Sequence, residues 1–70
     1  MPERCAALID ELVSIRKSKG WSQQDLSDAC GLKQSVIARL ESKKNTPTLS
    51  TVYKITDALG VALTISTIDA

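Results

Sequence analysis

The chain has 70 residues, nine of them Lys or Arg and eight Asp or Glu, for a formal net charge of +1. This length predicts a single domain over residues 1–70 that buries only about 60% of its unfolded surface, so a partner would add stability. The sequence has no histidine, no nucleotide loop and no separated carboxylate pair, which argues against an enzyme. Because it has no signal peptide and no apolar span of about 18 residues, we expect a soluble, cytoplasmic protein with no membrane partner.

Apolar residues repeat at helical spacing from Glu3 onward and predict a first helix. This helix should end at Lys19, because Gly20 follows it. Its buried face comprises Cys5, Leu8, Ile9, Leu12 and Ile15.

A second helix is predicted to start after Ser22, whose hydroxyl can cap it. Asp25 stands three residues later, in a variant of the capping box, and Trp21 and Leu26 occupy the positions of a hydrophobic staple. Because aspartate is shorter than the preferred glutamate, the reciprocal bond of the box is left open. The helix start is expected with or without it.

The second helix should run to about Ala29 and turn at Gly31, since glycine adopts the left-handed conformation at little cost. A third helix is predicted from about Gln34 to Ser42. Its packed face comprises Val36, Ile37 and Leu40. Its free face comprises Gln34, Ser35, Ala38, Arg39 and Ser42.

The free face of the third helix lacks the Glu/Lys pairs that usually solubilise an exposed helix. Glutamine can bond the N6/N7 edge of adenine and arginine the O6/N7 edge of guanine, while serine or alanine leaves room for a thymine methyl. These residue types suit the reading of a DNA groove. An ordinary solvated face is an equally good interpretation of this helix alone.

Lys33 occupies the expected N-cap of the third helix, where Ser, Thr, Asp or Asn would be about 1 kcal/mol better. It also places a cation at the positive end of the helix dipole. Two local penalties at one residue suggest that Lys33 contacts an external anion. A DNA phosphate or the edge of a guanine would supply this contact. The alternative is a neutral surface lysine with a shifted cap.

A fourth helix is predicted after Pro47, with Thr48 as its cap and Gly60 at its end. Its buried face comprises Leu49, Val52, Ile55 and Leu59. The lone aromatic residues, Trp21 and Tyr53, are interpreted as packing residues rather than base-stacking ones, because Trp21 stands at a staple position. Tyr53 could reach either the core or solvent.

Residues 61–68 alternate and are rich in β-branched side chains, which predicts a strand. A single strand leaves backbone groups unpaired and needs the edge of another chain. We therefore expect a homodimer whose strands pair antiparallel across a two-fold axis, through Val61, Leu63, Ile65 and Ile68. A loose tail and a short fifth helix are the alternatives.

The two cysteines, Cys5 and Cys30, form no CxxC pair. Both stand at apolar positions of helical patterns, so we expect buried cytosolic thiols, with a disulfide between them left open. Without a histidine to join them they predict no metal site, and no cofactor is expected.

Charge is distributed unevenly along the chain. Residues 16–44 hold seven basic and three acidic residues, a net of +4, whereas the remainder holds two basic and five acidic residues, a net of −3. This polarity would turn residues 16–44 toward a phosphate backbone, with an affinity that falls as salt rises.

The segment GWSQQDLSDACGLKQSVIARLE, continuing through SKKNTPTLSTVYKITDALGV, closely resembles the Cro/Xre-type helix-turn-helix domain of phage repressors and small bacterial regulators. The resemblance covers about residues 12–63. Its most specific positions are Ser22, Gln23, Leu26, Gly31, Ile37, Glu41, Pro47, Leu49 and Ala58-Leu59-Gly60. It implies an all-α, lambda-repressor-like domain of four helices with the motif at 22–42, to which the C-terminal strand would be added.

The resemblance also implies residue roles. Gln23 would contact a DNA phosphate, supported by the cap at Ser22, and Arg16 and Glu41 would form a structural ion pair. The expected base-reading residues are Lys33, Gln34, Ser35, Ala38 and Arg39. The expected phosphate contacts are Ser22, Gln23, Lys43, Lys44 and Asn45.

The sequence departs from the family pattern at four positions. Cys30 replaces leucine, Lys33 a capping Ser or Thr, Lys43 a glycine, and Thr56 a small apolar residue. Lys43 matters most, because a helix end that normally uses glycine is expected to end differently here. The path of residues 43–47 is therefore left open.

The resemblance implies a dimeric transcriptional regulator, most simply a repressor, that binds double-stranded DNA. Its two third helices would enter successive major grooves about 34 Å apart on a palindromic operator. The runs GWSQ, LKQS and TLSTVYKI look like HipB-type antitoxins, which implies a toxin partner as an alternative. A protein-interaction module on the same fold is a third possibility, but acidic or bulky apolar residues are absent from positions 34, 35 and 39.

Overall fold

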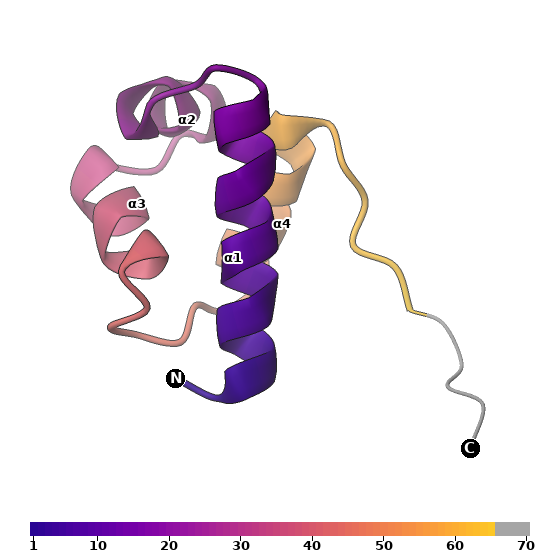
Figure 1. Cartoon of the computed structure of the whole chain (residues 1–70). Helices are drawn as coiled ribbons and strands as arrows, with labels where there is room; N and C mark the ends of the chain where they lie inside the picture. The colour runs from indigo at the N-terminus through magenta and orange to yellow at the C-terminus, as the bar shows by residue number, and fades with distance from the viewer. Residues whose placement is uncertain (66–70) are drawn as a thin grey trace.

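The computed structural model describes residues 1–65. They form four helices: α1 (Glu3–Ser18), α2 (Gln23–Cys30), α3 (Gln34–Glu41) and α4 (Leu49–Leu59). In Figure 1, α2 and α3 lie to one side of the long α1, and α4 passes behind it. The all-α prediction and the four predicted helices are confirmed, with bounds within about one residue of those expected.

One hydrophobic core joins the four helices. It comprises Ile9 and Leu12 of α1, Leu26 of α2, Ile37 and Leu40 of α3, and Ile55 and Leu59 of α4. Helices as short as α2 and α3, eight residues each, are marginal in isolation. Their positions therefore depend on this shared core.

The entrance of α2 is fixed by a complete capping box. The Ser22 hydroxyl accepts a hydrogen bond from the Asp25 backbone N–H at 3.1 Å, and the Asp25 carboxylate accepts one from the Ser22 N–H at 2.8 Å. The reciprocal bond that the short aspartate left open is thus formed. Trp21 packs half-buried against the core, and Gly31 ends α2 with φ +76°, as predicted.

Several predictions of burial were wrong. Leu8 and Ile15, expected on the buried face of α1, are only half-buried. Leu49 is 62% exposed, because it opens α4 one turn before Val52, the first buried residue of that helix. Val36 is 39% exposed, since the short α3 meets the core through only Ile37 and Leu40. The two cysteines, at positions 5 and 30, are free thiols and only half-buried.

The end of α3 also corrects an expectation. Lys43 itself adopts the left-handed conformation, with φ +60°, so the helix ends as it would with glycine. The Lys43 N–H donates to the Leu40 carbonyl at 3.0 Å and the Lys44 N–H to the Arg39 carbonyl at 3.4 Å, the pattern of a Schellman motif. The Lys43 ammonium lies 2.7 Å from a carboxylate oxygen of Asp10 on α1.

The departure at Thr56 is accommodated inside the core. Its side chain is only 3% exposed, and its hydroxyl donates a hydrogen bond to the Tyr53 carbonyl at 3.1 Å. A hydroxyl paired within its own helix avoids the cost of an unsatisfied buried polar group. Tyr53 itself is 45% exposed.

After α4 the chain turns at Gly60, which has φ +73°, and residues 61–65 form no regular secondary structure. Val61 and Leu63 are half-buried, whereas Ile65 is fully exposed. The rest of the predicted strand, including Ile68, lies outside the described residues. Among the helices described, none is long and apolar enough to span a membrane.

Candidate nucleic-acid interface

The turn between α2 and α3 is held from both sides. The Gly31 N–H donates to the Ser27 carbonyl at 3.0 Å, and the Ser27 hydroxyl donates to the Leu32 carbonyl. Ser27 is buried, and Leu32 packs half-buried against the core. The two short helices are therefore presented in one fixed arrangement.

The outer face of α3 carries most of the predicted base-reading residues. Lys33, Gln34, Ser35 and Arg39 are exposed, while Ala38 is half-buried. Lys33 is the N-cap and offers no side-chain cap bond, which matches the penalty inferred from the sequence. The first turn of α3 therefore starts with a cation where α2 and α4 have a hydroxyl cap, from Ser22 and Thr48.

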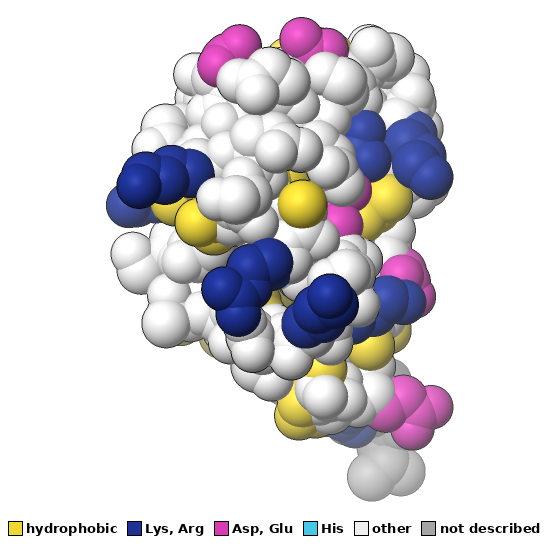
Figure 2. Space-filling view, turned by 90° about the vertical axis from the view of Figure 1, so that its left-hand side faces the viewer, with side chains coloured by type: hydrophobic (Ala, Val, Ile, Leu, Met, Phe, Trp, Pro, Cys, Tyr) yellow, Lys and Arg dark blue, Asp and Glu magenta, His cyan; other side chains and the backbone are white. Residues whose placement is uncertain are grey.

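Figure 2 shows the side of the molecule that lies at the left of Figure 1, where α2 and α3 are found. Lys and Arg side chains are spread across the middle of this face, and acidic side chains lie toward its upper and right-hand margins. Such an arrangement favours an anionic partner.

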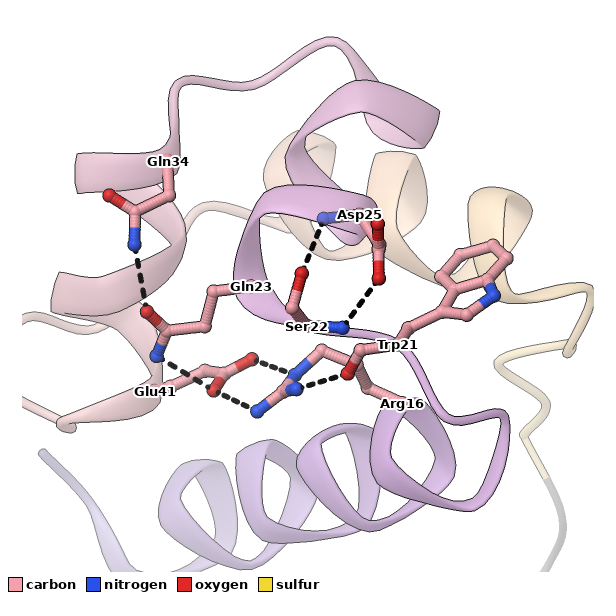
Figure 3. Close-up of polar contacts among 7 residues, drawn as sticks. All are labelled: Arg16, Trp21, Ser22, Gln23, Asp25, Gln34 and Glu41. Carbon is pink, nitrogen blue, oxygen red and sulfur yellow. Dashed lines mark hydrogen bonds and ion pairs between the residues drawn. The ribbon is translucent and has the colours of Figure 1, made fainter.

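A buried ion pair lies beneath this face. The Nε and Nη2 atoms of Arg16 on α1 each donate to a carboxylate oxygen of Glu41 on α3 at 2.8 Å (Figure 3). The two side chains are 8% and 9% exposed. A third nitrogen of Arg16, Nη1, donates to the Trp21 carbonyl just before α2. The pair thus joins α1, α3 and the entrance of α2.

Two glutamines extend the hydrogen bonds of this ion pair toward the surface (Figure 3). The Gln23 Nε2 atom donates to Glu41 Oε1 at 3.2 Å, and the Gln34 Nε2 atom donates to Gln23 Oε1 at 2.9 Å. Gln23 opens α2 and Gln34 opens α3. The structure therefore links a predicted phosphate-contacting residue to a predicted base-reading residue.

The predicted phosphate-contacting residues differ in their exposure to solvent. Ser22, Lys44 and Asn45 are exposed, whereas Gln23 and Lys43 are half-buried and Lys43 faces Asp10. With its amide oxygen oriented toward α3, Asn45 accepts a hydrogen bond from Arg39 Nη2 at 3.0 Å. An open pocket of about 190 Å³ lies beside this contact, between α3 and the start of α4.

The contacts of this region that were not predicted from the sequence include Lys43 with Asp10, Gln23 with Glu41, and Gln34 with Gln23. Only the first had a visible signal, a lysine at a position where the family has glycine. Trp21, interpreted as a packing residue, has Lys19 Nζ at 5.6 Å from its ring centroid. Within residues 1–65, no group of three or more His, Cys, Asp or Glu side chains is placed to hold a metal ion.

Comparison with known proteins gives consistent matches. A family model described as helix-turn-helix matches residues 12–65. An uncharacterised HTH-type transcriptional regulator of Haemophilus influenzae is 42% identical over 59 residues, 84% of this chain and 60% of that protein. The antitoxin HipB of Escherichia coli is 31% identical over 58 residues, 83% of this chain and 66% of HipB. The chain thus spans about three fifths to two thirds of these relatives.

A solved structure of a HipB variant in an O2 20mer complex superposes with a TM-score of 0.84. It is 28% identical, and the match covers 93% of this chain and 90% of that chain. The four-helix arrangement is therefore the one found in that complex.

Proposed function

The chain belongs to the Cro/Xre-type helix-turn-helix family, and on that basis we propose that it binds double-stranded DNA sequence-specifically as a transcriptional regulator. The observation that carries the proposal is the link from Gln34 through Gln23 to the buried Arg16–Glu41 pair. It holds an exposed amide at the first position of α3. An amide held in one place at the N-terminal end of a helix is suited to bidentate contact with a base edge.

We assign the contacts to two groups. The base-reading group comprises Lys33, Gln34, Ser35, Ala38 and Arg39. The phosphate group comprises Ser22, Gln23, Lys43, Lys44 and Asn45. Base contacts would set the sequence preference, while phosphate contacts would set the register of α3 in the major groove. To contact a phosphate, Lys43 would have to break its ion pair with Asp10. The loss of this pair would cost little free energy, because both side chains are more than a third exposed.

We further propose that the regulator acts as a dimer on a palindromic operator, most simply as a repressor that occupies a promoter. One α3 reads a half-site, so a two-fold pair would place two such helices in successive major grooves about 34 Å apart. The exposed Ile65 and the alternating residues around it support pairing of the C-terminal segments.

Selection of binding sites from random DNA tests the base-reading assignment. We expect Gln34→Ala and Arg39→Ala each to lose preference at one base pair per half-site, by about 5- to 150-fold for a good bidentate contact. Lys54→Ala is the matched control, because Lys54 is an exposed cation on α4, outside the basic segment 16–44. If both α3 variants select the same sequence with the same affinity as the native chain, the assigned face is wrong.

The similarity to HipB favours a second candidate function, an antitoxin that represses its own operon and also binds a toxin. A neighbouring reading frame encoding a kinase-like toxin, together with a stable complex of the two purified proteins, would support it. Failure of the two proteins to associate would leave a stand-alone regulator. A protein-interaction module that does not bind DNA is less well supported, because small polar residues occupy the outer face of α3.

A further inference from the structure

Of the two lysines assigned to the phosphate group, Lys43 already has an anionic partner within the chain. Its Nζ atom donates to a carboxylate oxygen of Asp10 on α1 at 2.7 Å. Lys44 is exposed and forms no ion pair with the residues that the structure describes. An ammonium bound to a carboxylate makes the same kind of charge-assisted hydrogen bond that it would make to a phosphate.

The loop after α3 keeps its path without this ion pair. The backbone N–H groups of Lys43 and Lys44 already close the end of α3 in a Schellman motif. The buried Arg16–Glu41 pair already ties α3 to α1. Lysine reaches Asp10 through a flexible four-carbon stem, and the Asp10 side chain is 63% exposed, so the pair adds little rigidity. Its main consequence is that the charge of Lys43 is occupied.

Asp10 and a DNA phosphate compete for this charge. Lys43 carries one positive charge, and an ammonium that bridged both groups would bring two anions together. Contact with DNA therefore requires Lys43 to leave Asp10. The free energy of the lost ion pair is then subtracted from the free energy gained at the phosphate.

We propose that Asp10 lowers the affinity of this chain for DNA by holding the Lys43 ammonium in place of a phosphate. This role rests on the proposed DNA binding. It belongs to a residue of α1 that lies outside the motif at 22–42 and acts through Lys43. Because the family pattern has glycine at position 43, the competition is a property of the residues of this chain.

Two other effects of Asp10 predict different results. Direct repulsion between Asp10 and the DNA phosphates would weaken binding to the same extent whether or not residue 43 is charged. A purely structural pair would position the loop, so its removal would weaken binding. Competition predicts that removal of the Asp10 charge tightens binding, and that the gain is larger when Lys43 is present.

Four proteins separate these effects: the native chain, Asp10→Asn, Lys43→Met and the double variant. Methionine keeps an unbranched side chain at position 43 and removes the charge. We expect Asp10→Asn to tighten binding about 1.4- to 5-fold more beside Lys43 than in Lys43→Met, the factor that corresponds to an exposed ion pair. Fluorescence anisotropy with labelled DNA measures this factor. A duplex of arbitrary sequence and a duplex selected by the native chain should give the same value, because phosphate contacts carry no base information.

Glu11→Gln is the matched control. Glu11 is the exposed acidic neighbour of Asp10 on α1, so its replacement changes the net charge of the chain by the same amount. It should have the same effect on affinity in the native chain and in Lys43→Met. An equal effect of Asp10→Asn in these two backgrounds, or weaker binding after Asp10→Asn, would overturn the proposal.

A measurement without DNA separates this proposal from the proposed function. ¹⁵N relaxation of the lysine ammonium groups in the free protein should find Lys43 Nζ ordered in the native chain and mobile in Asp10→Asn. Equal mobility of this group in both proteins would overturn the role of Asp10 whether or not the chain binds DNA. A native chain that binds neither duplex, with Lys43 Nζ ordered, would overturn the proposed function and the role of Asp10 with it.

Discussion

The residue that ties most of this structure together is Arg16. It is 7% exposed, donates to Glu41 and to the Trp21 carbonyl, and so connects α1, α3 and the entrance of α2. A buried pair of this kind is strongly destabilising when one partner is removed, because the other charge is left uncompensated.

We expect Arg16→Met to lower the free energy of unfolding by about 3–5 kcal/mol, measured by urea denaturation. The double variant Arg16→Met, Glu41→Leu removes both charges and should recover most of that loss. A double variant as unstable as the single one would contradict the view that the isolated carboxylate causes the loss.

Lys43 is the second informative residue, because its backbone is left-handed although it carries a side chain. That conformation costs about 1–2 kcal/mol, whereas an exposed ion pair such as Lys43–Asp10 contributes about 0.2–1 kcal/mol. Lys43→Gly should therefore raise the free energy of unfolding by roughly 0.5–1 kcal/mol. Lys44→Gly, at a neighbour whose φ is not positive, should lower it slightly, and equal effects at the two positions would contradict this explanation.

At the residue scale the sequence predicted local features better than distant ones. The cap at Ser22 and the turn at Gly31 depend on neighbours within a few positions, and both are present. The bond between Gln23 and Gln34 was not predicted, because it depends on how α2 and α3 cross. At Lys43 the family pattern was misleading: the lysine adopts the backbone of the glycine that it replaces.

At the scale of elements, α3 combines a core-facing side of Ile37 and Leu40 with an outer side of small polar residues and cations. The sequence located this helix to within one residue, because its apolar spacing is helical. It overestimated the burial of Val36 and of Leu49 in α4, because periodicity gives the direction of a side chain but not where the neighbouring helices end.

The uncapped start of α3 suggests a trade between stability and binding. Lys33 has the extended backbone of an N-cap but provides no cap bond, so Lys33→Ser should raise the free energy of unfolding by about 1 kcal/mol. It should also weaken DNA binding and reduce the slope of log affinity against log salt by about 0.9 if one phosphate contact is lost. The exposed Lys54 provides the control: Lys54→Ser should leave the salt dependence unchanged and lower the free energy of unfolding slightly, because serine is a weaker helix former than lysine. A stabilised Lys33→Ser with native salt dependence would argue against a phosphate role.

At the scale of the whole molecule, a 70-residue chain with one small core gains from association. The C-terminal segment is where we expect that association, and its residues 61–65 form no regular secondary structure in the single chain. A strand that pairs only with another chain forms only when the edge of that chain is present. The pattern of one sequence therefore could not establish the pairing.

We expect light scattering at micromolar concentration to give twice the chain mass. Ile65→Lys should shift the mass toward the monomer, because it places a charge on the alternating apolar side of the segment. Thr64→Lys, on the side opposite Val61, Leu63 and Ile65, is the matched control and should remain dimeric. A monomeric native chain, or the same mass for both variants, would count against strand pairing.

We propose that the outer face of α3 reads a DNA sequence. Selection of binding sites from a random DNA pool with the native chain, followed by footprinting at two salt concentrations, tests this. We predict an enriched sequence with two half-sites related by a two-fold axis, about one helical turn apart, and protection that weakens as salt rises. A pool without an enriched sequence, although the chain is folded, would show that α3 does not read a DNA sequence.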